Sequence, residues 1–378
     1  MKEIHTCDIF CSVVDNYGDI GIASRLARQL LDEQGLQVRL WVDDLQVFNQ
    51  LHNDISIQLE SQDWRGVEVR RWTASLPQVI PCDLVIEAFA CELPESFLRA
   101  MAARPVKPVW INLEYLSAES WVVGCHGLPS PHPRSPLSKY FFFPGYSHAT
   151  GGLLREGSLL ARIQTFQRDP GSQSAFWKGL AVPVPKQGET KVSLFAYENH
   201  AIPSLLGSFA RHQGAVTCFL PIGKALVPAL DFLGKDSAAV GECFREGNLT
   251  LRILPFLSQG DYDRLLWACD VNIVRGEDSF IRAQFAGRPV LWQAYVQEDG
   301  AHEKKVEAWL DLYLEGIDPC LAEDMRKLFS AWNRQKAVPR NVLEIITGCS
   351  RHARAWASHL AGLPSLSETL VKFAISKV

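Results

Sequence analysis

The chain has 378 residues, a length that fits two ordinary domains better than one. Its apolar content of 47% and charged content of 21% are typical of a folded globular protein and exclude a disordered one. A net charge of −4 without a basic tail argues against nonspecific nucleic-acid binding, and no apolar run approaches the roughly 20 residues of a membrane span.

The first half of the chain alternates short apolar strands with helices. Strands are predicted at 9–14, 37–42, 84–87 and 109–113, and helices at 22–31 and 94–103. This order predicts parallel strands joined by right-handed crossovers.

A segment with two prolines and a glycine, 180–189, is typical of a linker, and the alternation restarts after it. Further strands are predicted at 191–195, 215–219, 249–253, 271–274 and 289–292, helices at 262–268 and 280–285, and a mostly helical tail beyond 301. We therefore predict an α/β protein with two doubly wound, Rossmann-like domains, 1–182 and 189–360, that face each other across a ligand-binding cleft.

The loop after the first strand, residues 14–21 (V-D-N-Y-G-D-I-G), is the most informative part of the sequence. In open α/β sheets, ligands bind at the carboxyl ends of the strands, where this loop lies. Asp15 and Asp19 either hold the turn and cap the following helix, or supply a catalytic base. Gly18 and Gly21 permit close backbone approach, but the loop has no G-x-G-x-x-G phosphate signature.

A second cluster, Arg275 to Ser279 (R-G-E-D-S), follows a predicted strand and opens a helix. The N–H groups at a helix start attract anions, and an arginine fork suits phosphate oxygens, so this cluster predicts a diphosphate site. The alternative is that Asp278 or Ser279 caps the helix while Arg275 pairs with Glu277; the two interpretations are compatible. The two acids would repel a diphosphate, which favours contacts with ribose or sugar hydroxyls, or with the acceptor.

Two weaker patterns occur in the second half. Tyr197, at a strand end, is a candidate for stacking in the cleft, whereas Phe195 is interpreted as a core side chain. The sequence Asp261-Tyr262-Asp263 matches the D-x-D metal motif of some sugar transferases, but acids are also favoured at the start of a helix.

Several other functions lack support in the sequence. The ten cysteines form no C-x-x-C pair, and the histidines form no H-x-x-x-H motif, which argues against a zinc site. There is no G-x-S-x-G elbow of a serine hydrolase. No signal peptide is recognised, so we expect a cytoplasmic protein with reduced thiols. The segment 151–156 is interpreted as a loop that enters the cleft.

The chain resembles the protein-arginine rhamnosyltransferases that modify elongation factor P, the EarP family, along nearly its whole length. The motifs that carry the resemblance are F-C-S-V-V-D-N-Y-G-D-I-G with R-L-A-R-Q-L (10–30), L-W-V-D-D-L (40–45), I-E-A-F-A-C-E-L-P-E (86–95), N-L-E-Y-L-S-A-E (112–119), G-G-L-L-R-E (151–156) and I-V-R-G-E-D-S-F-I-R-A-Q-F-A-G-R-P (273–289).

The resemblance implies a GT-B fold in which a C-terminal helix within 362–378 packs back on the first domain. It implies inverting transfer of rhamnose from dTDP-β-L-rhamnose, held by the second domain, to an arginine of elongation factor P, docked on the first. It implies no metal ion and no cofactor besides this donor substrate. By motif match, Asp19 is the general base, and Asp15 and Glu277 are further catalytic acids. The residues assigned to donor binding are Asn16, Tyr17, Gly18, Tyr197, Gln259, Arg275, Gly276, Asp278 and Ser279.

Two positions depart from the family pattern. Ser24 stands where an aromatic residue is usual, and the segment 293–297 (Q-A-Y-V-Q) stands where a histidine and a proline are usual.

Two other functions remain open from the residues alone. One is a GT-B transferase with another nucleotide sugar or a small-molecule acceptor, and the other is a non-catalytic ligand-binding protein with two domains.

Overall fold

A computed structural model describes residues 4–15, 17–73, 76–297 and 300–378 of the chain. The contacts divide the chain into two units. Unit 1 comprises Met1–Gly157 and Gly362–Val378, and unit 2 comprises Ser158–Ala361.

The boundary between the units lies earlier than the predicted linker at 180–189. The helices α5 (Leu159–Arg168) and α6 (Pro170–Gly179) belong to unit 2. Phe166 of α5 packs edge-on against Trp267, with 5.7 Å between ring centroids, and Gln167 Nε2 donates to the carbonyl of Ala286 at 2.9 Å. These contacts attach the two helices to the second sheet, so the segment rich in proline is a connection inside unit 2.

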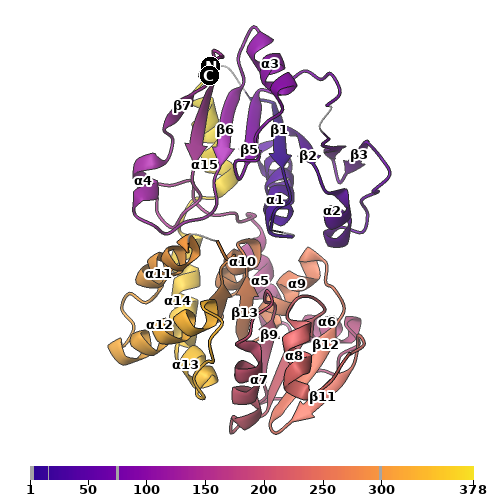
Figure 1. The fold of residues 1–378 in the computed structure, drawn as a ribbon, viewed down its shortest axis with the longest axis vertical. Helices are drawn as coiled ribbons and strands as arrows, with labels where there is room; N and C mark the ends of the chain where they lie inside the picture. Colours follow the sequence, from indigo (N-terminus) through magenta and orange to yellow (C-terminus); the bar gives the residue numbers. More distant parts are fainter. Residues whose placement is uncertain (1–3, 16, 74–75, 298–299) are drawn as a thin grey trace. The chain divides into compact units, whose positions relative to one another are not determined.

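The described residues of unit 1 form an eight-stranded sheet in the order β3-β4-β2-β1-β5-β6-β8-β7 (Figure 1). Its strands are β1 (Thr6–Cys11), β2 (Gln37–Val42), β3 (Ser61–Trp64), β4 (Val67–Arg71), β5 (Leu84–Ala88), β6 (Val109–Leu113), β7 (Pro129–Pro131) and β8 (Ser138–Phe142). Its helices are α1 (Tyr17–Gln34), α2 (Leu45–Leu51), α3 (Glu95–Ala103), α4 (Trp121–Cys125) and α15 (Leu366–Ile375). The six inner strands are parallel, and β3 and β7 pair antiparallel at the two edges.

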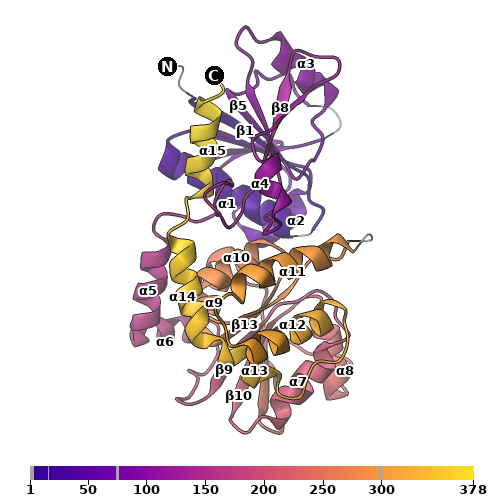
Figure 2. The same ribbon diagram turned by 90° about the vertical axis from the view of Figure 1, so that its left-hand side faces the viewer.

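The C-terminal segment returns to unit 1 and packs α15 beside α1 (Figure 2). Leu153 donates its N–H to the carbonyl of Pro364 at 3.1 Å and accepts the N–H of Leu366 at 2.8 Å. Gly152 has a φ of +73°, and a Cβ there would lie 2.2 Å from the oxygen of Pro364. The segment 151–156 therefore anchors the returning chain to unit 1.

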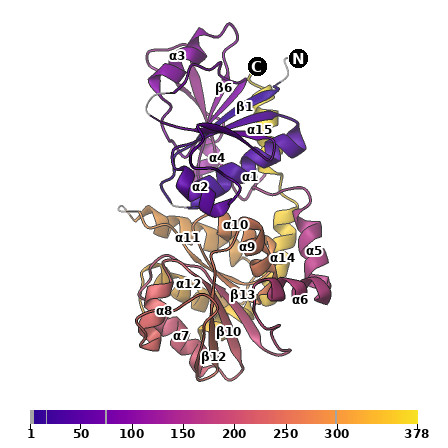
Figure 3. The same ribbon diagram turned by 90° about the vertical axis from the view of Figure 1, so that its right-hand side faces the viewer.

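The described residues of unit 2 form a six-stranded sheet in the order β11-β12-β10-β9-β13-β14, parallel except for β11 (Figure 3). Its strands are β9 (Thr190–Leu194), β10 (Val216–Pro221), β11 (Cys243–Glu246), β12 (Leu249–Leu254), β13 (Val271–Arg275) and β14 (Val290–Gln293). The remaining helices are α7 (Ile202–Arg211), α8 (Leu226–Leu233), α9 (Gln259–Ala268), α10 (Asp278–Phe285), α11 (Ala301–Tyr313), α12 (Pro319–Asn333), α13 (Val342–Gly348) and α14 (Ser350–Ala361).

The strands that lead to the predicted sites are buried. Every residue of β5, β6 and β13 is buried, as expected for parallel strands with helices on both faces. In the described part of the chain, no helix combines the length and apolar character that a membrane crossing requires.

Candidate functional site

In unit 1, the carboxylate of Asp19 lies in the first turn of α1, directly after the loop that follows β1. Asp19 is only 1% exposed. Its Oδ2 accepts the backbone N–H groups of Val14 at 2.9 Å and Asp15 at 2.8 Å. Its Oδ1 accepts the hydroxyl of Tyr115 at 3.0 Å. One oxygen of Asp19 therefore holds the loop that precedes α1, and the other faces a side chain from beyond β6.

The ring of Tyr115 packs against a strained loop that follows β5. Its ring stacks on Phe89, with 4.3 Å between centroids and 14° between planes. Phe89 and Ala90 both have left-handed backbones, with φ of +58° and +55°, which cost about 1–3 kcal/mol each. The N–H of Phe89 donates to the carbonyl of Leu113, and the N–H of Ala90 donates to Asn112 Oδ1. This loop after β5 holds an aromatic platform that fixes Tyr115 against Asp19.

Asp15 and Gly18 form one tight turn before α1. The N–H of Gly18 donates to the carbonyl of Asp15 at 2.7 Å, and a Cβ on Gly18 would lie 2.7 Å from Asp15 Oδ2. The turn therefore needs glycine so that the buried Asp15 carboxylate can lie against it. The hydroxyl of Tyr17 donates to Gln50 on α2. Asn16, which the sequence assigned to donor binding, lies outside the described residues.

The Ser24 departure is accommodated by a polar contact inside α1. Ser24 is fully buried, its hydroxyl donates to the carbonyl of Gly21 at 3.1 Å, and it lies 3.5 Å from His52 Nε2. Burial lowers the pKa of His52 to about 4, so the ring is neutral at physiological pH. His52 in turn packs against Trp64. The hydroxyl of Ser24 and the imidazole of His52 thus lie together in the buried region beside α1.

In unit 2, Arg275 is the last residue of β13 and is 7% exposed. Its guanidinium carbon lies 4.4 Å from the ring centroid of Tyr197 and 4.7 Å from that of Phe195. Two cation–π contacts therefore hold the planar group in a fixed orientation. The expected roles of the two aromatics are reversed in part, since Tyr197 is 8% exposed and Phe195, interpreted as core, is only half-buried.

The turn from β13 into α10 brings the other predicted donor-binding residues together. Gly276 has a φ of +61°, and the Ser279 hydroxyl donates to the carbonyl of Arg275. The N-cap residue is Glu277, one or two positions earlier than the predicted caps, and it makes no side-chain cap bond. Gln259, the first residue of α9, lies 3.4 Å from the Asp278 carboxylate through its Nε2. Two helix starts thus converge beside Arg275.

The D-x-D sequence serves structure in unit 2. Asp263 makes a bidentate pair with Arg282, at 3.1 Å to Nε and 2.6 Å to Nη2, and both side chains are buried. Asp261 accepts the hydroxyl of Ser258 and pairs with Arg264. The buried pair fastens α9 to α10, so Asp263 has a structural role next to the candidate site. Within the described ranges, no group of three or more histidine, cysteine, aspartate or glutamate residues could hold a metal ion.

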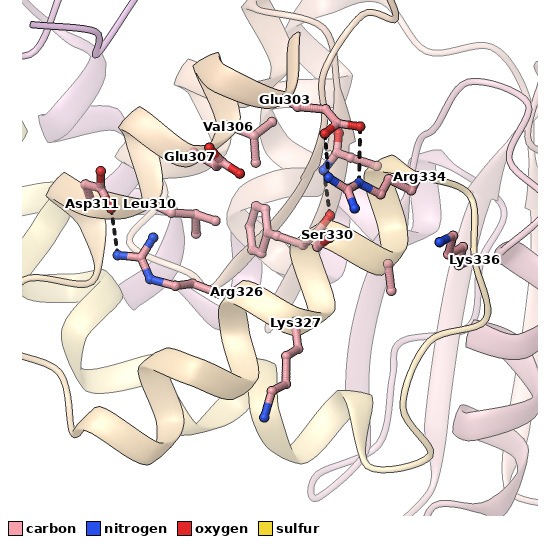
Figure 4. A pocket seen from close by; sticks show the side chains of 13 residues that line it. Glu303, Val306, Glu307, Leu310, Asp311, Arg326, Lys327, Ser330, Arg334 and Lys336 are labelled. Carbon is pink, nitrogen blue, oxygen red and sulfur yellow. Dashed lines mark hydrogen bonds and ion pairs between the residues drawn. The ribbon is translucent and has the colours of Figure 1, made fainter. Parts of the chain in front are cut away.

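A cavity of about 560 Å³ lies between α11 and α12 (Figure 4). Its charged rim is largely self-paired, with Arg334 and Glu303 at 2.7 Å and Arg326 and Asp311 at 2.7 Å. None of the predicted catalytic or donor-binding residues lines it. It is therefore separate from the candidate site.

Sequence reasoning missed Tyr115 and Gln293. Tyr115 entered only as part of the family motif 112–119, and Gln293 only as part of the unusual segment 293–297. The available signal in each case was a polar or aromatic side chain at the carboxyl end of a buried strand.

The fold places the protein among the GT-B glycosyltransferases. A spinosyn rhamnosyltransferase, SpnG, complexed with thymidine diphosphate shares it with a TM-score of 0.53 at 10% identity, covering 97% of this chain and 99% of that one. A solved structure concerned with EarP-mediated arginine glycosylation of translation elongation factor EF-P has a TM-score of 0.70 and 35% identity, covering 99% of both chains.

The family model described as elongation factor P rhamnosyltransferase EarP matches residues 7–375. A protein-arginine rhamnosyltransferase of Pseudomonas putida is 48% identical over 375 residues, 97% of this chain and 98% of that protein. Its counterpart in Pseudomonas aeruginosa is 46% identical over 369 residues, again covering 97% and 98%. The chain belongs to the EarP family of elongation factor P rhamnosyltransferases.

Proposed function

We propose that this chain transfers L-rhamnose from dTDP-β-L-rhamnose to an arginine side chain of elongation factor P, with inversion at the anomeric carbon. The observation that carries the proposal is the buried Asp19 carboxylate in the first turn of α1, in a chain that belongs to this family. Because the proposed acceptor is a translation factor, we also propose that the protein acts in the cytoplasm.

The acceptor chemistry requires a base. A guanidinium has a pKa above 12, and its nitrogen lone pairs are delocalised, so it is a poor nucleophile until a proton leaves. As the bond from nitrogen to the anomeric carbon forms, that nitrogen becomes acidic and can give its proton to a carboxylate. Asp19 Oδ1 is the proposed proton acceptor, because Oδ2 already holds two backbone N–H groups. The product guanidinium keeps its positive charge.

The leaving group requires positive charge. The bond between the anomeric carbon and the diphosphate oxygen breaks, and its electron pair leaves with dTDP. We propose that Arg275 and the N–H groups at the start of α10 stabilise this diphosphate. Tyr197 and Gln259 would contact the nucleotide, and Glu277 and Asp278 the ribose, the sugar or the acceptor. Asp15 would support the acceptor guanidinium beside Asp19.

The proposal is tested by incubating the purified chain with elongation factor P and a panel of nucleotide sugars. With dTDP-β-L-rhamnose, intact-mass measurement should show a gain of about 146 Da, one deoxyhexose residue, on the acceptor. An arginine-to-lysine variant of the modified position in elongation factor P should show no gain. Preference for another nucleotide sugar, or for small guanidines over the protein, would favour a different GT-B transferase. Binding without transfer to any acceptor would favour a ligand-binding protein.

A chelator should leave the transfer rate unchanged. Arg275 supplies positive charge for the diphosphate, and Asp263 is committed to Arg282, so the mechanism does not call for a divalent ion. The measurement is the initial rate with and without excess EDTA. Loss of activity that magnesium or manganese restores would contradict the expectation and revive the metal interpretation of the D-x-D sequence.

Replacing Tyr115 by phenylalanine should lower kcat by roughly tenfold while the KM for elongation factor P changes little. The variant removes one hydrogen bond to a charged group, the donor that orients Asp19 Oδ1, but keeps the ring stacked on Phe89. Tyr140→Phe is the matched control, because that ring packs against Phe373, away from Asp19. Steady-state kinetics of both variants check the result, and equal losses would argue against positioning by Tyr115.

A further inference from the structure

Gln293, at the end of the strand next to β13, lies beside Arg275. Gln293 is the last residue of β14 and is the register partner of Arg275 on β13. It is 1% exposed, and its backbone carbonyl accepts the N–H of Gly276 at 3.1 Å. Its side-chain Oε1 accepts the backbone N–H of Tyr197 at 3.0 Å. The amide therefore lies among three residues already assigned to donor binding.

The NH₂ group of the Gln293 side-chain amide makes no hydrogen bond to the described residues. Gln293 Nε2 is buried and has no hydrogen-bond partner among the residues that the structure describes. Exchanging the oxygen and nitrogen of the amide does not solve the problem, because the N–H of Tyr197 requires an acceptor. Buried donors in native proteins are nearly always paired, so an unpaired one needs a partner such as a bound ligand or an ordered water.

The backbone around Gln293 prevents the amide from turning away. Asn333 on α12 accepts the N–H of Ala294 at 3.0 Å and donates to the carbonyl of Trp292 at 2.9 Å. The same amide of Asn333 also donates to the carbonyl of Phe329 at 3.0 Å, which fixes it on its own helix. One side chain thus clamps the residues on both sides of Gln293, and the unpaired N–H is held ready for a ligand.

The ligand atom must be a hydrogen-bond acceptor at the carboxyl ends of β13 and β14. The same edge carries the Arg275 guanidinium and the start of α10, which together favour an anion. We propose that Gln293 Nε2 donates a hydrogen bond to a diphosphate oxygen of the bound nucleotide. This assignment rests on the proposed function, because it takes a thymidine diphosphate sugar as the ligand.

Two variants and two probes test the assignment by calorimetry. Gln293→Glu keeps an oxygen for the N–H of Tyr197 but replaces the donor with an anionic oxygen. It should weaken dTDP binding by more than about tenfold and thymidine binding by less than about twofold. Gln293→Met adds no charge but removes both the donor and the acceptor of the Tyr197 N–H, so its loss of dTDP affinity should be smaller than that of Gln293→Glu, and any loss of thymidine affinity measures the disturbance of the Tyr197 backbone. Gln187→Glu, exposed in the connection before β9, is the control for added charge and should bind as the wild type does.

Three outcomes would overturn the assignment. The first is dTDP affinity within about twofold of wild type in Gln293→Glu. The second is an equal loss for dTDP and thymidine, which would mean that the variant only disturbs the Tyr197 backbone. The third is unchanged dTDP affinity with a raised KM for dTDP-β-L-rhamnose, which would place the acceptor oxygen on the sugar. A wild-type chain that binds no thymidine nucleotide at all would instead contradict the proposed function on which the assignment rests.

Discussion

Asparagine in place of Asp19 should lower the rate of rhamnose transfer to elongation factor P by about 10²- to 10⁴-fold, the usual contribution of a general base. The asparagine amide has nearly the shape of the carboxylate. Its oxygen can still accept the N–H groups of Val14 and Asp15, so the loop and the start of α1 should keep their structure. The amide is not basic, however, because the lone pair of its nitrogen is delocalised into the carbonyl group, so it cannot take the proton from the acceptor guanidinium.

The Asp19→Asn experiment needs a control for the loop itself. Asp43 accepts the N–H of Val13 and the hydroxyl of Ser12, and so holds the same loop from its other side. Asp43→Asn should therefore disturb the loop without removing the base, and should retain most of the activity. Single-turnover rates by intact mass, dTDP affinity and thermal melting should be measured for both variants. Near-normal turnover of Asp19→Asn, or equal losses in both, would remove Asp19 as the base.

The central strands β5 and β6 could be predicted because every residue in them is buried. The predicted strands 37–42 and 109–113 coincide with β2 and β6, which read as nearly continuous apolar runs. Strands β4 and β11 were missed, and so were the two edge strands of the first sheet, β3 and β7. Strands β3 and β7 are short and partly exposed, with the sequences S-Q-D-W and P-S-P, and they depend on antiparallel pairing with a neighbour that local sequence does not reveal.

The predicted domain boundary was placed too late in the chain. The prediction followed the prolines and the glycine, whereas tertiary packing sets the boundary. Prolines and a glycine in 180–189 mark a real irregular segment, but helices α5 and α6 before it already pack on unit 2. The decisive contact, Phe166 against Trp267, joins residues about 100 positions apart. Such packing follows from the tertiary structure and leaves no periodic trace in the sequence.

A site residue could be predicted from the sequence only where its place next to a single predicted strand was enough to indicate a role. Arg275 is the last residue of a buried strand, and Asp19 lies just beyond the loop that follows another, and these positions alone indicated a ligand edge. Tyr115 and Gln293 acquire their roles from strand order and register. β1, β5 and β6 are neighbours in one sheet, and β9, β13 and β14 in the other, which brings Tyr115 to Asp19 and Gln293 to Tyr197.

Removing the guanidinium in Arg275→Ala should weaken dTDP binding by roughly 10- to 100-fold, because hydrogen bonds between ionised groups are about twice as strong as neutral ones. The effect should reach kcat as well, since the same group is proposed to stabilise the leaving diphosphate. Arg275→Lys should recover only part of the loss. A lysine keeps the charge but not the planar fork that lies over Tyr197 and Phe195.

The matched control is Arg264→Ala, which removes an arginine of α9 that is about half exposed and pairs with Asp261. Exposed pairs contribute little to stability, so this variant should bind dTDP as the wild type does. Calorimetry with dTDP and with thymidine separates the two ways in which Arg275→Ala could fail. If only dTDP binding weakens, the guanidinium acts on phosphate. If both weaken equally, the loss comes from the aromatic pair beneath it, and unchanged dTDP affinity would refute the diphosphate role outright.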